Sequence, residues 1–343
     1  MIASYVFQLT ATTLTPLAHG ETSEGNEQVL RREPLLAWDE GLDDYRELLV
    51  PLVSGAALKA TLREHAVHRY LATLGVERLG RDRLRLLLKG GRYERGDTGG
   101  VNASEQWELR QNCPLLGVFG SMDRGTPNRG CVQVHGLRAW VREAVEAGLQ
   151  PAHIVEGDET RPLFADSRGP IRLADATHVE QRFRHDLSLS SMGARLELAD
   201  GEAAAARQEA VAARREEGGR VGARERRRAN ESMPYTTETI SAGVPMLGEI
   251  RLENATLPEL WTFQLALRDW ILSGARLGGI AREGFGHLAV QVRGAWQLEL
   301  QPAFTLPPGA VAVDAAPDVQ VEGMLTAHLA ERRTSILTWL GAP

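Results

Sequence analysis

Hydrophobic and polar residues follow a helical spacing between residues 55 and 74. At about 100° per residue, one stripe of the segment is apolar, consisting of Leu58, Leu62, Ala66, Val67, Tyr70, Leu71 and Leu74. Charged and polar side chains cover the opposite side, as on a helix that packs against a core. The pattern predicts a core helix that begins just after Ser54, a good N-cap residue, and Gly55, which allows a close approach of the backbone.

Two cations of this helix, Lys59 and Arg63, fall inside the apolar stripe. A cation on a buried side is costly unless its stem extends to solvent or an anion meets it. Because both lie in the first turns, beside the free amides of a helix N-terminus, they indicate an anion site, and phosphate is the usual anion. The alternative is that both side chains extend outward along the edge of a core helix.

Alternating and helical patterns recur elsewhere. Residues 2–14 alternate as a strand with Tyr5, Phe7 and Leu9 on one face, and a polar loop over 15–41 is expected to follow. A second core helix over 257–273 is predicted by its apolar spacing, with Thr256 and Glu259 as a capping box. The order of strand, helix, strands, then strand, helix, strand favours an α+β fold. We expect a ferredoxin-like or RNA-recognition-type core, with two helices on one side of an antiparallel sheet and large insertions.

Composition and charge place the chain among globular proteins. Hydrophobic residues make up 43% of it and charged residues 24%, and the net charge of −6 argues against a surface that is basic throughout, although a local basic groove remains compatible with it. Only Lys59 and Lys89 among the 39 basic residues are lysines. The planar guanidinium of arginine suits phosphate better than the ammonium of lysine, because it can donate two hydrogen bonds at once. No segment has the length of a membrane span or the pattern of a targeting peptide, so a cytoplasmic protein without membrane partners is expected.

The motifs of several enzyme classes are absent from the sequence, which has no phosphate-binding loop ending in Gly-Lys-Ser/Thr, no His-Glu-x-x-His and no Gly-x-Ser-x-Gly. Cys113 and Cys131 cannot form a disulfide scaffold, and with His135 they lack the paired ligands of a closed zinc site, so no metal or cofactor is expected. His19 and Asp39 could each serve in acid and base chemistry.

Two glycine-bounded turns carry residues that suit RNA. The earlier turn contains Phe119, Gly120 and Ser121, and the later one contains Gly278, Gly279, Arg282 and Phe285. Glycine lets a backbone come close to a ligand, arginine neutralises phosphate and phenylalanine can stack on a base. The alternative is that both phenylalanines are core residues beside tight turns.

Three segments together resemble a known family. "VPLVSGAALKATLREH", "CPLLGVFGS" and "GARLGGIAREGFGHLAV" are similar, in this order, to motifs of the RAMP superfamily of CRISPR systems. The arrangement most resembles the repeated backbone subunit of type IV effector complexes and next that of type III complexes. The similarity does not reach the last forty or so residues.

The resemblance implies a non-catalytic subunit that polymerises along guide RNA and presents it for pairing with target nucleic acid. Its implied partners are the guide RNA, the target through the guide, copies of itself and other effector subunits. Lys59 and Arg63 would then point to the guide backbone, with Ser54 and Gly55 shaping the helix start, and the two glycine turns would be further RNA contacts. Under a type III-like alternative, Asp39 would help to cleave target RNA, although "AWDEGLDDY" lacks a convincing match to the type III segment. In a third interpretation, His19 would act as the base of a guide-processing ribonuclease.

The resemblance also suggests four segments. Residues 1–155 and 236–300 would form the two parts of the core, and residues 156–235 a thumb-like insertion laid over the guide. Residues 301–343 would form a tail with an amphipathic helix. Residues 200–232, which are nearly free of large apolar side chains, are expected to be a charged excursion of the surface.

Overall fold

The computed structural model describes residues 2–24, 27–39, 41, 43–90, 103–123, 126–156, 159–164, 169–184, 233–279, 284–296 and 319–341. The chain forms two compact units, the first comprising residues 1–19, 30–178 and 239–343 and the second comprising residues 20–29 and 179–238. The first unit contains the predicted site residues.

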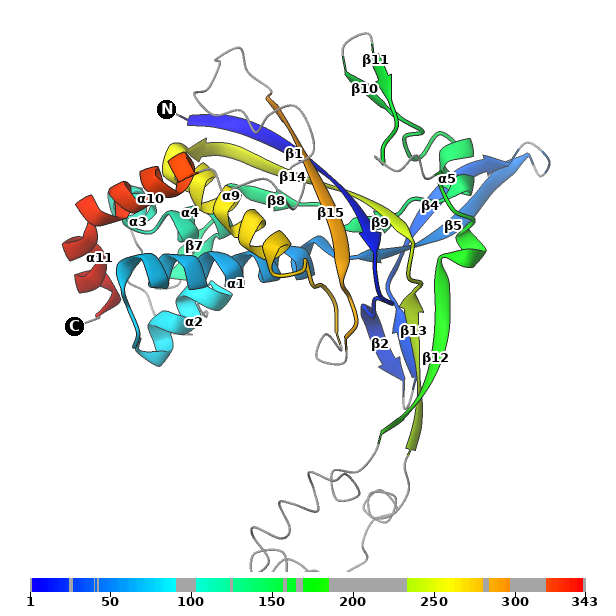
Figure 1. The fold of residues 1–343 in the computed structure, drawn as a ribbon, viewed down its shortest axis with the longest axis horizontal. Helices are drawn as coiled ribbons and strands as arrows, with labels where there is room; N and C mark the ends of the chain where they lie inside the picture. The colour runs from blue at the N-terminus through cyan, green and yellow to red at the C-terminus, as the bar shows by residue number, and fades with distance from the viewer. Residues whose placement is uncertain are drawn as a thin grey trace, which may run out of the picture. The chain divides into compact units, whose positions relative to one another are not determined.

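A seven-stranded sheet forms the centre of the first unit (Figure 1). Along the sheet, the order is β15 (Leu288–Trp296), β1 (Ile2–Thr13), β14 (Pro245–Thr256), β9 (Leu137–Ala139), β5 (Asp44–Val53) and β4 (Arg32–Asp39), and β8 (Val132–Val134) also pairs with β14. Each pairing is antiparallel. Two long helices, α1 (Gly55–Leu74) and α9 (Leu257–Leu272), connect β5 to later strands and β14 to β15.

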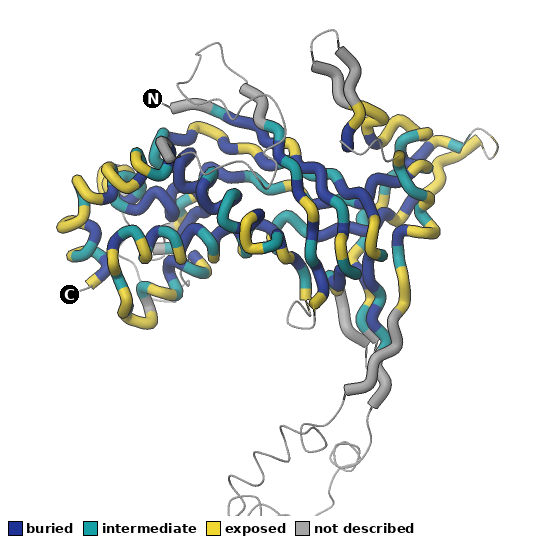
Figure 2. The backbone as a smooth tube through the Cα atoms, viewed as in Figure 1, coloured by how far each residue is buried: buried dark blue, intermediate teal, exposed yellow. Residues whose placement is uncertain are grey.

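The topology confirms the predicted α+β fold with a ferredoxin-like core. If β8 and β9 are taken as one interrupted strand, the chain runs β1, α1, β8/β9, β14, α9, β15, and the sheet order places β15 and β14 on either side of β1. The strand face carrying Tyr5, Phe7 and Leu9 is buried, as predicted, and the rings of Phe7 and Phe263 lie 5.1 Å apart. Figure 2 shows buried residues along the strands of this sheet and in the helices beside them.

Helix α1 has the predicted stripe and caps. Six of the seven stripe residues are buried and the seventh, Leu71, packs against the core. Ser54 is the N-cap, and its Oγ accepts a hydrogen bond from the amide of Ala57 at 3.3 Å. Gly75 ends the helix with φ 68°, a left-handed conformation that glycine adopts without strain.

The predicted capping box of α9 is present. Glu259 accepts from both the amide and the hydroxyl of Thr256, at 2.8 and 2.9 Å. The carboxylate is fully buried and forms a two-pronged pair with Arg110 of α3 (Ala103–Asn112), at 2.7 and 2.9 Å. Gly117 leaves room for it, because a Cβ there would lie 1.9 Å from Glu259 Oε1. This arrangement ties α3 and α4 (Pro114–Phe119) to the start of α9.

One local prediction was wrong. The expected loop over 15–41 contains β2 (Gly20–Glu24), β3 (Glu27–Leu30) and β4, because main-chain hydrogen bonds can form strands in a segment whose side chains give no strand pattern. The apolar run at 114–119 is helix α4, and after β9 only Arg142–Glu146 (α5) is helical. The described part of the tail, residues 319–341, contains two helices, α10 (Val319–Glu331) and α11 (Arg333–Leu340).

Shorter elements complete the described chain: α2 (Arg81–Lys89), β6 (Ser121–Asp123), β7 (Thr126–Asn128), β10 (Ile154–Glu156), β11 (Glu159–Arg161) and a 3₁₀ turn over Leu173–Asp175. A four-stranded sheet in the order β12 (Thr177–Arg184), β13 (Met233–Ile240), β3 and β2 accounts for the described part of the second unit. Most of the predicted thumb-like insertion, residues 185–232, lies outside the described residues, and the predicted segment boundaries stay predictions. No helix of the described chain is long and apolar enough to cross a bilayer.

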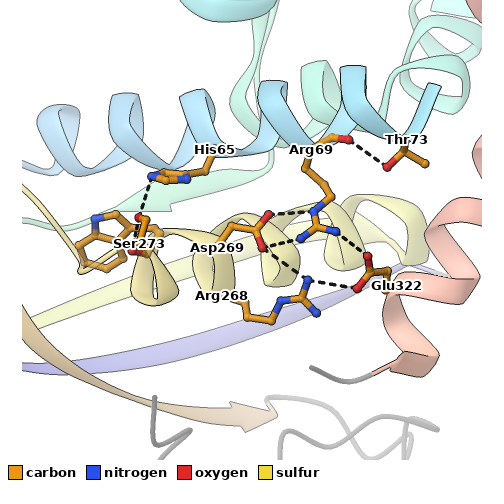
Figure 3. Close-up of polar contacts among 8 residues, drawn as sticks. His65, Arg69, Thr73, Arg268, Asp269, Ser273 and Glu322 are labelled. Carbon is orange, nitrogen blue, oxygen red and sulfur yellow. Dashed lines mark hydrogen bonds and ion pairs between the residues drawn. The ribbon is translucent and has the colours of Figure 1, made fainter. Parts of the chain in front are cut away.

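A closed network of charges joins the tail to the core (Figure 3). Arg69 of α1 donates two hydrogen bonds to Asp269 of α9, at 2.8 and 2.7 Å, and one to Glu322 of α10, at 2.5 Å. Arg268 lies 3.4 Å from Asp269 and 3.2 Å from Glu322. Each cation in this network therefore contacts carboxylates, and three helices are held together.

Candidate nucleic-acid interface

The start of α1 lies against the chain that follows β1. The amide of Ser54 donates to Nε2 of His19 at 3.1 Å, and the Ser54 hydroxyl lies at the same distance from this nitrogen. Because an amide donor requires an unprotonated acceptor, the contact favours neutral His19. Burial, and then the nearby charge of Arg31, lower the pKa of His19, in agreement with this geometry. His19 is therefore a positioning group for the N-cap.

Glycines allow two segments to approach this start closely. A Cβ on Gly55 would lie 1.9 Å from the carbonyl oxygen of Val134, and one on Gly278 would lie 2.3 Å from that of Ala18. The amide of Gly279 donates to the same Ala18 carbonyl at 2.8 Å. Since Ala18 precedes His19, the structure brings the late glycine turn next to the helix start.

Arg63 lies inside the molecule, with only 7% of its surface exposed. Its guanidinium donates to three carbonyl oxygens, those of Leu87 at 2.5 Å, Leu86 at 3.0 Å and Gly120 at 3.0 Å. Burial lowers its pKa to about 10, so it stays charged at neutral pH. Backbone carbonyls thus take the place of the predicted phosphate around Arg63, and direct contact of this residue with RNA stays a prediction.

Lys59 lies one turn earlier and is half-buried. Its Nζ donates to the carbonyl of Val132 at 3.2 Å. Burial lowers its pKa, and the charges of Arg63 and Arg129 lower it further, since a cation beside two cations is less favoured. Among the described residues, no carboxylate pairs with Lys59.

The turn after α4 is shaped by two glycines in close contact. Gly120 has φ 82°, and a Cβ on Gly130 would lie 2.4 Å from the Gly120 amide nitrogen. The next residue, Ser121, is 8% exposed, and its Oγ has no hydrogen-bond partner among the described residues. Arg63 of α1 donates a hydrogen bond to the Gly120 carbonyl, so the earlier glycine turn lies next to the first turns of α1.

The two phenylalanines of the glycine turns belong to the interior. Phe119 is 4% exposed and Phe285 is 7% exposed. Their burial agrees with the alternative that they are core residues beside tight turns, and stacking on a base stays a prediction. Arg282 lies outside the described residues.

Arg129 is a candidate that sequence reasoning missed. It is exposed and its charge acts on Lys59. In a chain with 37 arginines, no local signal separates it from the others, because its proximity to Lys59 arises only when β8 packs beside α1. Lys59, Arg63 and Arg129 together form a concentration of positive charge, which we call the cation corner.

The residues proposed for acid–base chemistry or metal binding do not lie together in the described structure. Asp39 accepts from the amide of Gly41 at 3.0 Å and lies 3.9 Å from Arg46, at the tip of the β4–β5 hairpin. Burial raises the pKa of Cys113 to about 11 and that of Cys131 to about 12, so both are thiols at neutral pH. In the part of the chain that the structure describes, no three His, Cys, Asp or Glu side chains are grouped so as to hold a metal ion.

Comparison with known proteins gives one kind of match. No protein-family model and no curated protein matches the chain. Among solved structures, it is similar to a chain of a "Type IV-B CRISPR Complex", with a TM-score of 0.53 and 16% sequence identity. The match covers 91% of this chain and 97% of that chain. The protein therefore has the fold of a subunit of a type IV-B CRISPR complex.

Proposed function

We propose that the protein is a non-catalytic, RNA-binding backbone subunit of a type IV CRISPR effector complex. Several copies would coat the guide RNA, and base pairing between guide and target would supply the sequence specificity. The single observation that carries the proposal is the cation corner, where Lys59, Arg63 and Arg129 gather and Lys59 has no carboxylate partner among the described residues. The shared fold with a chain of a type IV-B complex supports the same assignment.

The three cations have different parts in this proposal. Lys59 and Arg129 bind phosphate oxygens of the guide. Lys59 is half-buried beside like charges, which a phosphate would compensate, and Arg129 is exposed to solvent. Arg63 acts as a positioning residue that holds the Gly120 turn. The hydroxyl of Ser121 is buried and has no hydrogen-bond partner among the described residues, so contact of Ser121 with RNA stays a prediction.

RNA binding measured by fluorescence anisotropy tests the proposal. Lys59→Glu is expected to weaken binding of single-stranded RNA by at least about tenfold and to lower the salt dependence by about one phosphate contact. Arg142→Glu is the matched control, since Arg142 is an exposed cation of α5 with the same charge change. Equal losses in the two variants, or none in Lys59→Glu, would contradict the proposal.

Arg63→Glu is unsuitable for this experiment. A carboxylate placed against the carbonyls of Leu86, Leu87 and Gly120 would be buried without a donor, so the protein would lose stability whatever its role in RNA binding. Circular dichroism of Lys59→Glu confirms that the fold is retained before the affinities are compared.

The nuclease alternatives receive less support. Asp39 contacts an amide and an arginine, and His19 contacts the N-cap Ser54. In the described structure, neither the contacts of Asp39 nor that of His19 places a second general acid or base beside these residues. Incubation of guide-bound protein with complementary RNA and Mg²⁺ tests the point, and cleavage that is lost in Asp39→Ala would favour the type III-like alternative.

A further inference from the structure

The chain has only two lysines, and their surroundings differ. Lys59 is half-buried against β8, where its Nζ donates to the Val132 carbonyl at 3.2 Å. Lys89 is the last residue of α2 and is exposed. A reagent that modifies lysine side chains therefore has two of them to choose between, and exposure alone would favour Lys89.

Two arginines place like charge near the Lys59 nitrogen. Arg63 lies one turn further along α1, and residues four apart on a helix have Cβ atoms about 5 to 6 Å apart. Its guanidinium is held in place, because three backbone carbonyls accept its hydrogen bonds. Arg129 precedes β8, which packs beside α1, and its charge also acts on Lys59. Both arginines disfavour a further positive charge on the Lys59 nitrogen.

Negative charge does not offset these cations in the described part of the chain. No carboxylate there pairs with Lys59. Cys131 also acts on Lys59, but it is an uncharged thiol at neutral pH because burial raises its pKa to about 12. Burial, and then the two arginines, therefore lower the pKa of Lys59 and increase the fraction of uncharged amine. A lysine that is desolvated or lies beside another cation is activated as a nucleophile in this way.

The cation corner also favours an anionic reagent over a neutral one. Arg129 is exposed, and a guanidinium can bind phosphate through two parallel hydrogen bonds. In an acyl phosphate, the phosphate is attached to the carbonyl carbon that an amine attacks. A phosphate bound by Arg129 therefore brings this carbon into the neighbourhood of Lys59, and an uncharged acylating agent gains no such binding.

We propose that Lys59 is a site of covalent acylation by acyl phosphates. The lone pair of Nζ attacks the carbonyl carbon, a C–N bond forms, and the C–O bond to the phosphate breaks. The phosphate leaves with the electron pair of that bond, and the attacking amine gives a proton to water. The product is an uncharged amide, so the cation corner loses one positive charge. The inference rests on the proposed function only for the consequence of this loss, which is weaker RNA binding.

Acetyl phosphate is the probe that tests the modification, and peptide mass spectrometry over time measures the rate at each lysine. Lys59 is expected to be acetylated at least about threefold faster than Lys89, although Lys89 is the more exposed of the two. Equal rates at the two lysines, or a faster reaction at Lys89, would overturn the inference, because exposure would then control the reaction.

A pair of arginine variants tests the part of the neighbouring cation. Arg129→Ala is expected to slow acetylation of Lys59 and to leave the rate at Lys89 unchanged, because it removes both the phosphate-binding group and a like charge. Arg142→Ala is the matched control, since Arg142 is an exposed arginine of α5, and it should change neither rate. An unchanged Lys59 rate in Arg129→Ala, or the same decrease in both variants, would overturn the inference.

RNA separates this inference from the proposed function. Single-stranded RNA is expected to protect Lys59 from acetylation, and acetylated wild-type protein should bind RNA about tenfold more weakly. Lys59→Arg keeps the positive charge and cannot be acetylated at this position, so treatment with acetyl phosphate should leave its RNA affinity unchanged. An equal loss of affinity in Lys59→Arg would place the effect at another amine and overturn the regulatory consequence. Rapid acetylation of Lys59 without protection by RNA or loss of affinity would instead uphold the modification and contradict the proposed function.

Discussion

The cations at the two ends of helix α1 have opposite kinds of partner. Near its C-terminal end, Arg69 contacts Asp269 and Glu322, so its charge is met by carboxylates on two other helices. Near its N-terminal end, Lys59 and Arg63 contact only backbone carbonyls among the described groups, and Lys59 lies beside further cations.

This difference separates a structural cluster from a binding surface. Cations that are paired with carboxylates hold helices together and leave little charge to attract a ligand. Cations without carboxylate partners on a partly exposed surface attract an anion. The two unpaired cations also differ in burial. Arg63 is buried and donates to three backbone carbonyls, whereas Lys59 is only half-buried and donates to one. Each prediction below alters one side of this comparison.

Arg63→Ala is expected to have the largest effect. It leaves the carbonyls of Leu86, Leu87 and Gly120 without their donor and opens a cavity, so the free energy of unfolding should fall by about 3 to 5 kcal/mol. Urea denaturation measures the change. A loss below about 1 kcal/mol would show that these hydrogen bonds do not hold the Gly120 turn.

Removal of Lys59 and Arg129 should have the next largest effect, which should be on RNA affinity and not on stability. Lys59→Ala with Arg129→Ala is expected to lower RNA affinity about tenfold to a hundredfold, as loss of two phosphate contacts does, while the free energy of unfolding changes by less than about 1 kcal/mol. Anisotropy titrations at several salt concentrations measure the first quantity and urea denaturation the second. Comparable losses in both would place Lys59 with Arg63 as a structural residue.

Arg69→Met tests the compensated end of the helix. The variant keeps apolar volume but leaves Asp269 with Arg268 as its remaining cation, so stability should fall by about 1 to 2 kcal/mol. RNA affinity should stay unchanged, because the removed charge was already neutralised. A loss of RNA affinity in the folded variant would contradict the division between the two ends.

His19 is expected to give the smallest effect, visible as a dependence on pH. Burial and Arg31 lower its pKa in the folded protein, so the unfolded chain binds the proton first as the pH falls. The stability from the neutral His19–Ser54 contact is complete above the unfolded pKa of about 6.5 and is lost as the pH falls toward the lowered folded value. His19→Gln should flatten this part of the stability profile, measured by thermal unfolding between neutral and mildly acidic pH.

Much of the core followed from the sequence, because its signals are local. The stripe of α1, the Ser54 cap and the Thr256–Glu259 capping box depend on spacings of three and four residues. The strands β2 and β3 gave no such signal, since their residues are mostly polar and β3 pairs with the distant strand β13. β4 does contain apolar residues, but its strand conformation depends on pairing with β5 in a hairpin.

The sequence predicted which residue types form the candidate site but not what each of these residues contacts. Lys59 and Arg63 have the same sequence signal, two cations on an apolar stripe, and only the packing of α2 and the Gly120 turn around Arg63 separates them. Arg129 joins the cation corner because β8, which follows it, packs beside α1, a contact between segments far apart in the sequence. The exposed apolar face of the β4–β5 hairpin similarly depends on the register of the two strands, which no local pattern fixes.

The most direct test of the central claim is to identify the nucleic acid that accompanies the protein. Wild type and Lys59→Glu with Arg129→Glu would each be co-expressed with a CRISPR array and purified, and the bound nucleic acid extracted and sized. The account predicts RNA of guide length with the wild type and its absence from the folded variant. Wild-type protein free of nucleic acid, or the same RNA bound equally by both proteins, would contradict the claim that the cation corner binds guide RNA.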